Sequence, residues 1–308
     1  MIVQFSVTNF RSIDEEQTLN LYMIGSQGGL LGNTVPFKGT QYRFLKSVGI
    51  YGANASGKSN LLLALSSLRK MILNSWSFQE DQTIDYFEPC SFREQGTTTS
   101  PTKFEIEFTL PYEKVETRFV YALHFNKSNV VYERLGAYFS NRESLLFLRE
   151  KIESQYNFEF GASFKGGAKN IPCFPNQSYL SVAGRNAASP EIIRHIVSYV
   201  RNKIVHIDSF EKRMFMLDKS HERAWNLVSH IDVGINSARL EENNVSEEDL
   251  HFPADLPSKI KESILNNLRR SIVLNHNDSL GKNVDIDFEE ESDGTKKMIR
   301  LLPKVTDA

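Results

Sequence analysis

Residues 52–59 read Gly-Ala-Asn-Ala-Ser-Gly-Lys-Ser, a complete GxxxxGK[ST] pattern that constrains the fold more than any other feature of this chain. A loop of this kind joins a strand to the N-terminus of a helix, where it binds phosphate groups. Residues 46–51 before it read as an apolar strand. The residues after it place an apolar stripe at helical spacing, at Leu61, Leu65, Leu68 and Ile72. The sequence therefore predicts a strand, a phosphate-binding loop and a helix that packs against a sheet.

The motif assigns a role to most of its residues. Gly52 and Gly57 allow the backbone to turn its N–H groups toward the phosphates. Lys58 is expected to reach the β and γ phosphates, and the Ser59 hydroxyl is expected to ligate Mg²⁺. The residues expected to bind nucleotide here are Gly52, Ala53, Asn54, Ala55, Ser56, Gly57, Lys58, Ser59 and Asn60. We expect ATP rather than GTP, because Asn126-Lys-Ser-Asn129 departs from the guanine-reading NKxD pattern at its last position.

Two further segments narrow the class of protein. Residues 1–13 and 16–22 read as two strands joined by a short turn, with alternating apolar positions. Residues 291–297, Glu-Ser-Asp-Gly-Thr-Lys-Lys, start a helix. A serine and a glycine at a helix start are suited to binding an anion, but Ser-Asp-Gly is also an ordinary helix-capping turn. Taken alone, this segment leaves both interpretations open.

Together with the phosphate loop at Tyr51–Asn60, the segments Asn9-Phe-Arg-Ser12 and Glu291–Lys297 resemble the ABC-type ATPases of the SMC and RecF kind. The likeness is greatest to the bacterial abortive-infection and anti-phage ATPases of the RloA/AbiL type. This resemblance implies an α/β fold, an ABC-type P-loop NTPase head with an antiparallel side sheet and a helical insertion. It also implies a dimer in which two heads enclose two ATP molecules with Mg²⁺.

In such a dimer, Ser292 and Gly294 would contact the γ-phosphate held by Lys58 of the other head, and Arg11 and Ser12 would lie near the nucleotide. The family signature usually has Leu where this chain has Glu291 and Gly where it has Asp293. ATPases of this class also need a Walker B strand ending in Asp-Glu, and residues 298–308 contain none. We therefore expect the first part of a longer protein, or a naturally short form, that binds ATP and turns it over at background rate when alone.

The pattern along the chain suggests three regions. Residues 1–188 are expected to form the N-terminal lobe of the head, with the phosphate loop and a side sheet from about 102 to 148. Residues 150–167 read as a loop or ragged hairpin. Residues 189–272 are expected to be a mostly helical insertion, with helices starting at Ser189-Pro190-Glu191, near Lys219 and near Pro257. Residues 273–308 would begin a C-terminal lobe that carries the signature segment.

Composition adds few constraints. The formal net charge of −2 gives no overall attraction to nucleic acid, so a DNA-binding surface would be a local patch such as Lys259, Lys261, Arg269 and Arg270. The two cysteines suggest reduced thiols in a cytoplasm, and no apolar run is long enough to cross a membrane. Zinc is not expected, because no histidine pairs with a cysteine at ligand spacing. The acidic residues of 285–290 suit a solvated strand face better than a metal cluster.

Two functions remain open on the sequence. The first is an ATP-driven dimerising switch that acts with an effector protein or domain, in anti-phage defence according to the resemblance. The alternative is a DNA-repair ATPase, similar to RecF, whose closed dimer clamps DNA. ATP-dependent and salt-sensitive binding of DNA would distinguish them.

Overall fold

The computed structural model covers the whole chain and describes residues 1–23, 32–37, 40–53, 56–90, 100–204, 222–229, 235–243, 246, 261–262, 265, 270–277 and 282–306. Internal contacts divide the chain into two compact units, residues 1–206 and 207–308. The boundaries at 188 and 272 expected from the sequence are a different division of the chain and stay a prediction.

The first unit is built on a seven-stranded antiparallel sheet with the order β2-β1-β5-β6-β7-β8-β9. Its strands are β1 Ile2–Thr8, β2 Gln17–Asn20, β5 Thr102–Tyr112, β6 Val115–Phe125, β7 Val130–Tyr138, β8 Ser144–Ile152 and β9 Gln155–Phe160. A separate two-stranded sheet pairs β3 Thr34–Pro36 with β4 Arg43–Leu45. The predicted first hairpin and the predicted side sheet are confirmed. The sheet extends further than predicted, because β8 continues to Ile152 and pairs with β9, which lies within the segment 150–167 read as a loop or ragged hairpin.

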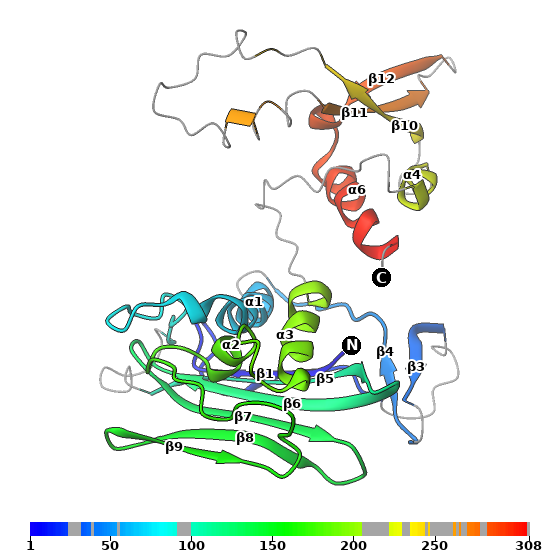
Figure 1. Cartoon of the computed structure of the whole chain (residues 1–308). Coiled ribbons are helices and arrows are strands. Elements are labelled where there is room, and N and C mark those ends of the chain that lie inside the picture. The colour runs from blue at the N-terminus through cyan, green and yellow to red at the C-terminus, as the bar shows by residue number, and fades with distance from the viewer. Residues whose placement is uncertain are drawn as a thin grey trace. The chain divides into compact units, whose positions relative to one another are not determined.

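Three helices lie on one face of this sheet, as Figure 1 shows: α1 Lys58–Asn74, α2 Tyr179–Ala183 and α3 Glu191–Lys203. A single turn of 3-10 helix, η2 Ser75–Ser77, follows α1. The predicted stripe of α1 packs into the core, with Leu68 and Ile72 buried and Leu61 and Leu65 partly buried against it. The α/β class with a large antiparallel sheet is therefore confirmed, and α3 begins directly after Pro190, as predicted.

The strand predicted before the phosphate loop is wrong. Regular pairing ends at Leu45, and residues 46–53 run on without a strand assignment. Tyr51 is 93% exposed and Val48 is 46% exposed, although both were expected in an apolar strand. A strand forms only where a neighbour accepts and donates its ladder hydrogen bonds. Lys46 and Ser47 still bond to Asn33 just before β3, but no strand in the described part of the chain pairs with residues 46–53.

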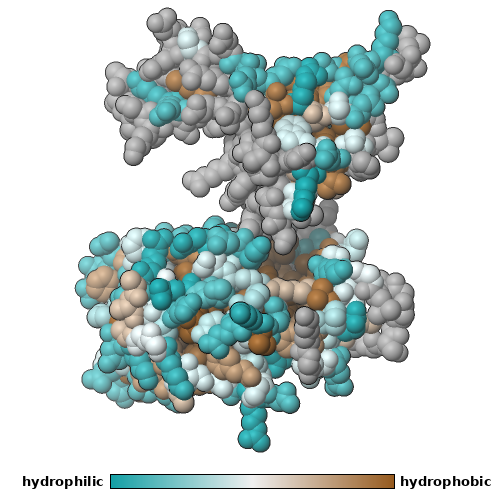
Figure 2. Space-filling model, turned by 45° about the vertical axis from the view of Figure 1, so that its right-hand side comes forward, coloured by the Kyte–Doolittle hydropathy of each residue, from teal (hydrophilic) through white to brown (hydrophobic). Residues whose placement is uncertain are grey.

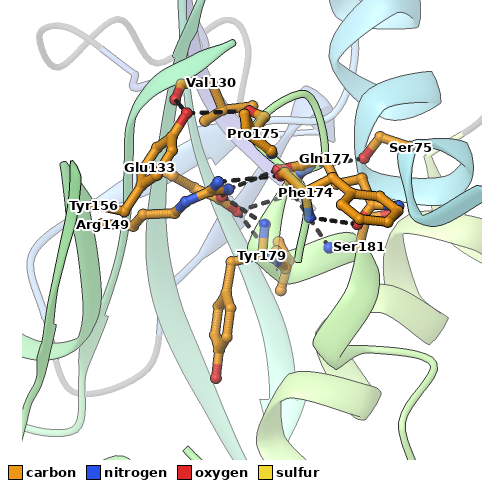
Figure 3. A network of polar contacts seen from close by, with 12 residues as sticks. Ser75, Val130, Glu133, Arg149, Tyr156, Phe174, Pro175, Gln177, Tyr179 and Ser181 are labelled. Atoms are coloured by element: carbon orange, nitrogen blue, oxygen red, sulfur yellow. Dashed lines mark hydrogen bonds and ion pairs between the residues drawn. The ribbon is translucent and has the colours of Figure 1, made fainter. Parts of the chain in front are cut away.

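A buried polar network fixes the start of α2 against the sheet (Figure 3). The Glu133 carboxylate on β7 accepts hydrogen bonds from the backbone N–H groups of Tyr179 and Leu180, at 2.7 and 2.8 Å. Arg149 on β8 lies 3.8 Å from this carboxylate and donates to the Gln177 carbonyl at 2.6 Å. Both charged side chains are at most 1% exposed. Each charge therefore has a partner, which a buried ion requires.

The second unit contains a three-stranded antiparallel sheet, with the order β10-β11-β12, and two helices that share a small core with it. Its elements are α4 Glu222–Val228, β10 Ile235–Glu242, β11 Arg270–Asn277, β12 Asn283–Asp287, η4 Phe288–Glu290 and α6 Asp293–Thr306. The core is formed mainly by Ala224, Val228, Ile235, Ile272, Leu274, Phe288, Ile299 and Leu302. The core therefore takes its side chains from α4, β10, β11, η4 and α6, whereas no residue of β12 is buried in it.

The structure places strands as well as helices within residues 189–272, and the prediction that this range is mostly helical stays a prediction, because much of it lies outside the described residues. β10 lies within this range, and β11 already starts at Arg270, where the helix from Pro257 was expected to continue. Ile272, Val273 and Leu274 are all buried, and a short apolar run of this kind fits a strand at the core. Lys219, Pro257, Lys259 and Arg269 lie outside the described residues, so the rest of those helices and most of the expected basic patch stay predictions.

The acidic strand β12 is explained by an ion pair. Arg239 of β10 donates to both oxygens of Asp285, at 3.0 and 2.6 Å, and Asn275 adds a third bond at 2.9 Å. The Arg239 guanidinium lowers the pKa of Asp285 to about 2. This geometry supports the solvated strand face over the metal cluster for Asp285.

Hydrophilic and intermediate side chains cover most of the face of the first unit that Figure 2 shows. None of the helices in the described ranges is both long enough and apolar enough to cross a lipid bilayer.

Candidate nucleotide site

The phosphate loop leads into a helix whose first turn has no side-chain cap. Gly57 precedes α1 and adopts a left-handed conformation, with φ 90° and ψ 2°. A residue with a side chain would be strained here, and an added Cβ would lie 3.3 Å from the Ser12 hydroxyl oxygen. The backbone N–H groups of the first turn have no intrahelical acceptor, and the partial positive charge of the helix adds to theirs. This end of α1 therefore has the donors and the polarity to bind an anion.

Lys58 lies over the loop, and its predicted contact with the β and γ phosphates stays a prediction. Its ammonium donates to the carbonyl oxygens of Gly52 at 2.8 Å and Ala53 at 2.6 Å. Both acceptors are neutral, and no carboxylate in the described part of the chain forms an ion pair with Lys58. Among the described residues, no carboxylate therefore neutralises the positive charge at the loop.

Close packing shapes the rest of the loop. A Cβ on Gly52 would lie 2.8 Å from the Ser56 hydroxyl oxygen, so this position has room only for glycine unless Ser56 moves. Ser56 and Ser59 are exposed. Asn54 and Ala55, which the motif also assigns to the nucleotide, lie outside the described residues.

The structure brings the β1–β2 turn to this loop, although 45 or more residues separate them in sequence. The Asn60 side-chain amide on the first turn of α1 donates to the Ser12 hydroxyl at 2.7 Å. Ser12 therefore lies beside both Asn60 and Gly57 at the phosphate loop, and its position near a bound nucleotide stays a prediction.

Arg11 is held differently. Its Nε donates to the Glu88 carboxylate at 2.7 Å, and its backbone N–H donates to the Glu88 carbonyl at the same distance. Both Arg11, with φ 53°, and Asn9, with φ 56°, are left-handed. The buried Asn9 side chain stabilises this turn, since it accepts from the Cys90 N–H and donates to the Ser100 carbonyl. Glu88, which sequence reasoning missed, thus fixes Arg11 beside the turn.

The signature segment forms the N-terminus of α6 in the second unit. The Ser292 hydroxyl accepts from the Thr295 N–H at 3.1 Å, and the Ser292 carbonyl accepts from the Lys296 N–H at 2.9 Å. Ser292 is therefore an ordinary N-cap, as one of the two sequence interpretations held. Among the described residues, an added Cβ at Gly294 would meet only the Ser292 hydroxyl, at 3.7 Å, so the side-chain face of Gly294 is open toward them. That open face leaves the anion-binding interpretation available as well.

One contact beside the signature was not predicted from the sequence. His276 Nε2 on β11 lies 2.5 Å from a carboxylate oxygen of Glu291, the residue before Ser292. The histidines looked scattered in the sequence, and only the fold of β11 onto the η4–α6 turn brings this one to the signature.

Comparison with known proteins gives one match. Residues 47–162 match the model of a family described as "AAA domain, putative AbiEii toxin, Type IV TA system". No curated protein and no solved structure matches. The matched residues include the phosphate loop, α1 and the strands β5–β8. In this part the chain is similar to P-loop ATPases of the AAA type, a family with an abortive-infection association.

Proposed function

We propose that the chain is the ATP-binding head of an ABC-type switch, in which ATP drives two heads together. The observation that carries this proposal is the uncapped start of α1, with the Lys58 ammonium above it bonded to neutral carbonyl oxygens and to no carboxylate among the described residues. A triphosphate supplies the negative charge and the acceptor oxygens that this arrangement lacks.

The residues around the loop fit ATP with Mg²⁺. Gly52 and Gly57 provide the close backbone approach, Lys58 would hold the β and γ phosphates, and the exposed Ser59 hydroxyl would ligate the metal ion. The bound metal would offset phosphate charge. Ser12 and Asn60 already lie at the loop and would order its outer side.

The dimer part of the proposal concerns Ser292 and Gly294. In this arrangement they approach the γ-phosphate on the other head, where the start of α6 offers its own N–H groups. Ser292→Arg or Gly294→Glu would place bulk or negative charge at that contact. The open face of Gly294 lets the separate head accommodate a side chain there.

The test is the mass of the protein in solution, measured by light scattering with and without Mg·ATP. The unchanged chain should form a dimer only with Mg·ATP. Ser292→Arg and Gly294→Glu should stay monomeric while their ATP affinity by calorimetry stays near that of the unchanged chain. Dimers that still form in these variants, or a loss of ATP binding by the separate heads, would contradict the enclosed-ATP arrangement.

We also propose that these 308 residues turn ATP over at no more than background rate. In-line attack needs a residue that orients water and a carboxylate that supports the metal, and groups that stabilise charge in such reactions contribute factors of about 10³–10⁵. Steady-state phosphate release that Lys58→Ala abolishes would instead assign a catalytic role to an acidic residue of this chain, such as Glu290 or Asp293.

The setting we favour is anti-phage defence, with an effector protein or domain as partner, and the description of the matching family supports it.

One observation favours the alternative function, an ATPase that clamps DNA. The Arg185 guanidinium lies over the Trp76 ring, 4.0 Å from the ring centroid. Both side chains line an open pocket together with Arg201. Such a site suits phosphates and bases. Salt-sensitive DNA binding that requires ATP, and that Arg185→Ala weakens, would favour this alternative.

A further inference from the structure

The contact between His276 and Glu291 links the second unit's sheet to the signature turn. Glu291 is only 9% exposed at its side chain, and His276 is 21% exposed. A carboxylate can only accept, so the short 2.5 Å contact is a hydrogen bond donated by the His276 ring. His276 shares a face of β11 with the buried Ile272 and Leu274, and the bond therefore holds the carboxylate against the sheet.

The bond can affect the start of α6 because of where Glu291 lies. Glu291 directly precedes Ser292, whose hydroxyl caps α6, and the chain turns there between η4 and α6. A carboxylate released from His276 would move toward the start of α6, the end of the helix that favours negative charge. It would then compete with any other anion that approaches Ser292 and Gly294.

We propose that His276 is a positioning residue for the signature segment: it holds the Glu291 carboxylate against the sheet and so keeps the start of α6 free for the partner head's γ-phosphate. This inference rests on the proposed function. It gives a role to Glu291, which stands where the resemblance expects leucine. It also gives a role to His276, which belongs to no sequence motif.

The test compares three variants. His276→Leu removes the donor at similar volume, His276→Gln keeps a donor on a flexible chain, and His276→Leu with Glu291→Gln also removes the carboxylate charge. His276→Leu should weaken ATP-driven dimerisation about tenfold, the effect of one lost hydrogen bond to a charged group. His276→Gln should stay within a few-fold of the unchanged chain, and the double variant should recover most of the loss. ATP affinity of the separate head should not change in any of them.

A matched control lies on the same small sheet. Arg239→Leu removes the partner of the Asp285 carboxylate on the solvated face, and it should leave dimerisation unchanged. Dimerisation of His276→Leu at the unchanged affinity, or a loss that the added Glu291→Gln does not relieve, would overturn the proposal.

A second readout needs no dimer and therefore separates this inference from the proposed function. Without nucleotide, His276→Leu should speed hydrogen exchange at residues 292–296, and His276→Gln should not. If the unchanged chain fails to dimerise with ATP, the proposed function fails, and this exchange measurement still decides whether His276 positions the turn. Unchanged exchange in His276→Leu would show that it does not.

Discussion

The helices α1 and α2 of the first unit both begin with backbone N–H groups that have no acceptor inside the helix, and the two starts differ in what binds these groups. At α2, Glu133 accepts from the Tyr179 and Leu180 N–H groups, and the Ser178 hydroxyl accepts from the Ser181 N–H. At α1, no side chain caps the first turn. The protein thus supplies its own anion to one helix start and leaves the other to water or a ligand.

Burial explains the difference. Glu133 and Ser178 are fully buried, where an unsatisfied donor would cost about 1–3 kcal/mol. Burial also raises the pKa of Tyr121, which stays a donor to Glu133 at 2.9 Å. The loop before α1 is exposed, so water can satisfy its N–H groups and a stronger anion can replace that water. The exposed and uncapped start of α1, rather than the capped start of α2, is therefore the place where a ligand anion can bind.

The largest effect, on the free energy of unfolding, should follow from removing the buried Glu133 carboxylate that caps the start of α2. Glu133→Gln keeps the shape of the side chain but leaves the Arg149 charge buried without a counter-charge. The first unit should lose about 3–5 kcal/mol of unfolding free energy, measured by urea denaturation with a probe in that unit.

Two further variants sharpen that measurement. Glu159→Gln changes an exposed glutamate on β9 and should stay within about 0.5 kcal/mol of the unchanged chain. Replacing both members of the pair, Glu133→Gln with Arg149→Met, should recover part of the loss. A small effect of Glu133→Gln would mean that the carboxylate does not stabilise the start of α2.

The second effect concerns the open helix start. Lys58→Ala should reduce affinity for Mg·ATP by about 100-fold or more, because it removes charge-assisted contacts worth about 1.5–3 kcal/mol each. Stability should change little, since the described hydrogen bonds of the Lys58 ammonium go to the carbonyl oxygens of the exposed Gly52 and Ala53. Calorimetry measures the affinity, with Lys127→Ala, at an exposed hairpin turn, as the control. Undiminished affinity in Lys58→Ala would remove the basis of the phosphate-loop assignment.

The smallest effect should come from the turn beside the loop. Asn60→Ala removes the 2.7 Å hydrogen bond to the Ser12 hydroxyl, a contact worth about 1 kcal/mol. ATP affinity should fall about fivefold by calorimetry, with Asn202→Ala on α3 as the control. Equal affinities for Asn60→Ala and the unchanged chain would show that Ser12 and Asn60 support the loop's structure without contributing to the nucleotide site.

Local sequence patterns were sufficient to predict α1, α3 and the strands β1, β2 and β5–β7, because the apolar periodicity of these elements matches the face that each one buries. They failed at 46–51, since pairing depends on a neighbouring strand that a local pattern does not report. The contacts of Glu88 with Arg11 and of His276 with Glu291 were missed for a related reason. Each joins residues brought together only by the fold, 77 and 15 positions apart.

The central claim is that the open start of α1 is the nucleotide site, whereas the start of α2 is already satisfied. Hydrogen exchange on the whole chain, with and without saturating Mg·ATP, tests it most directly. We predict that ATP slows exchange at residues 56–61, leaves residues 178–181 unchanged, and has no effect on either segment in Lys58→Ala. Unchanged exchange at 56–61 in the presence of ATP, or protection that persists in Lys58→Ala, would contradict the account.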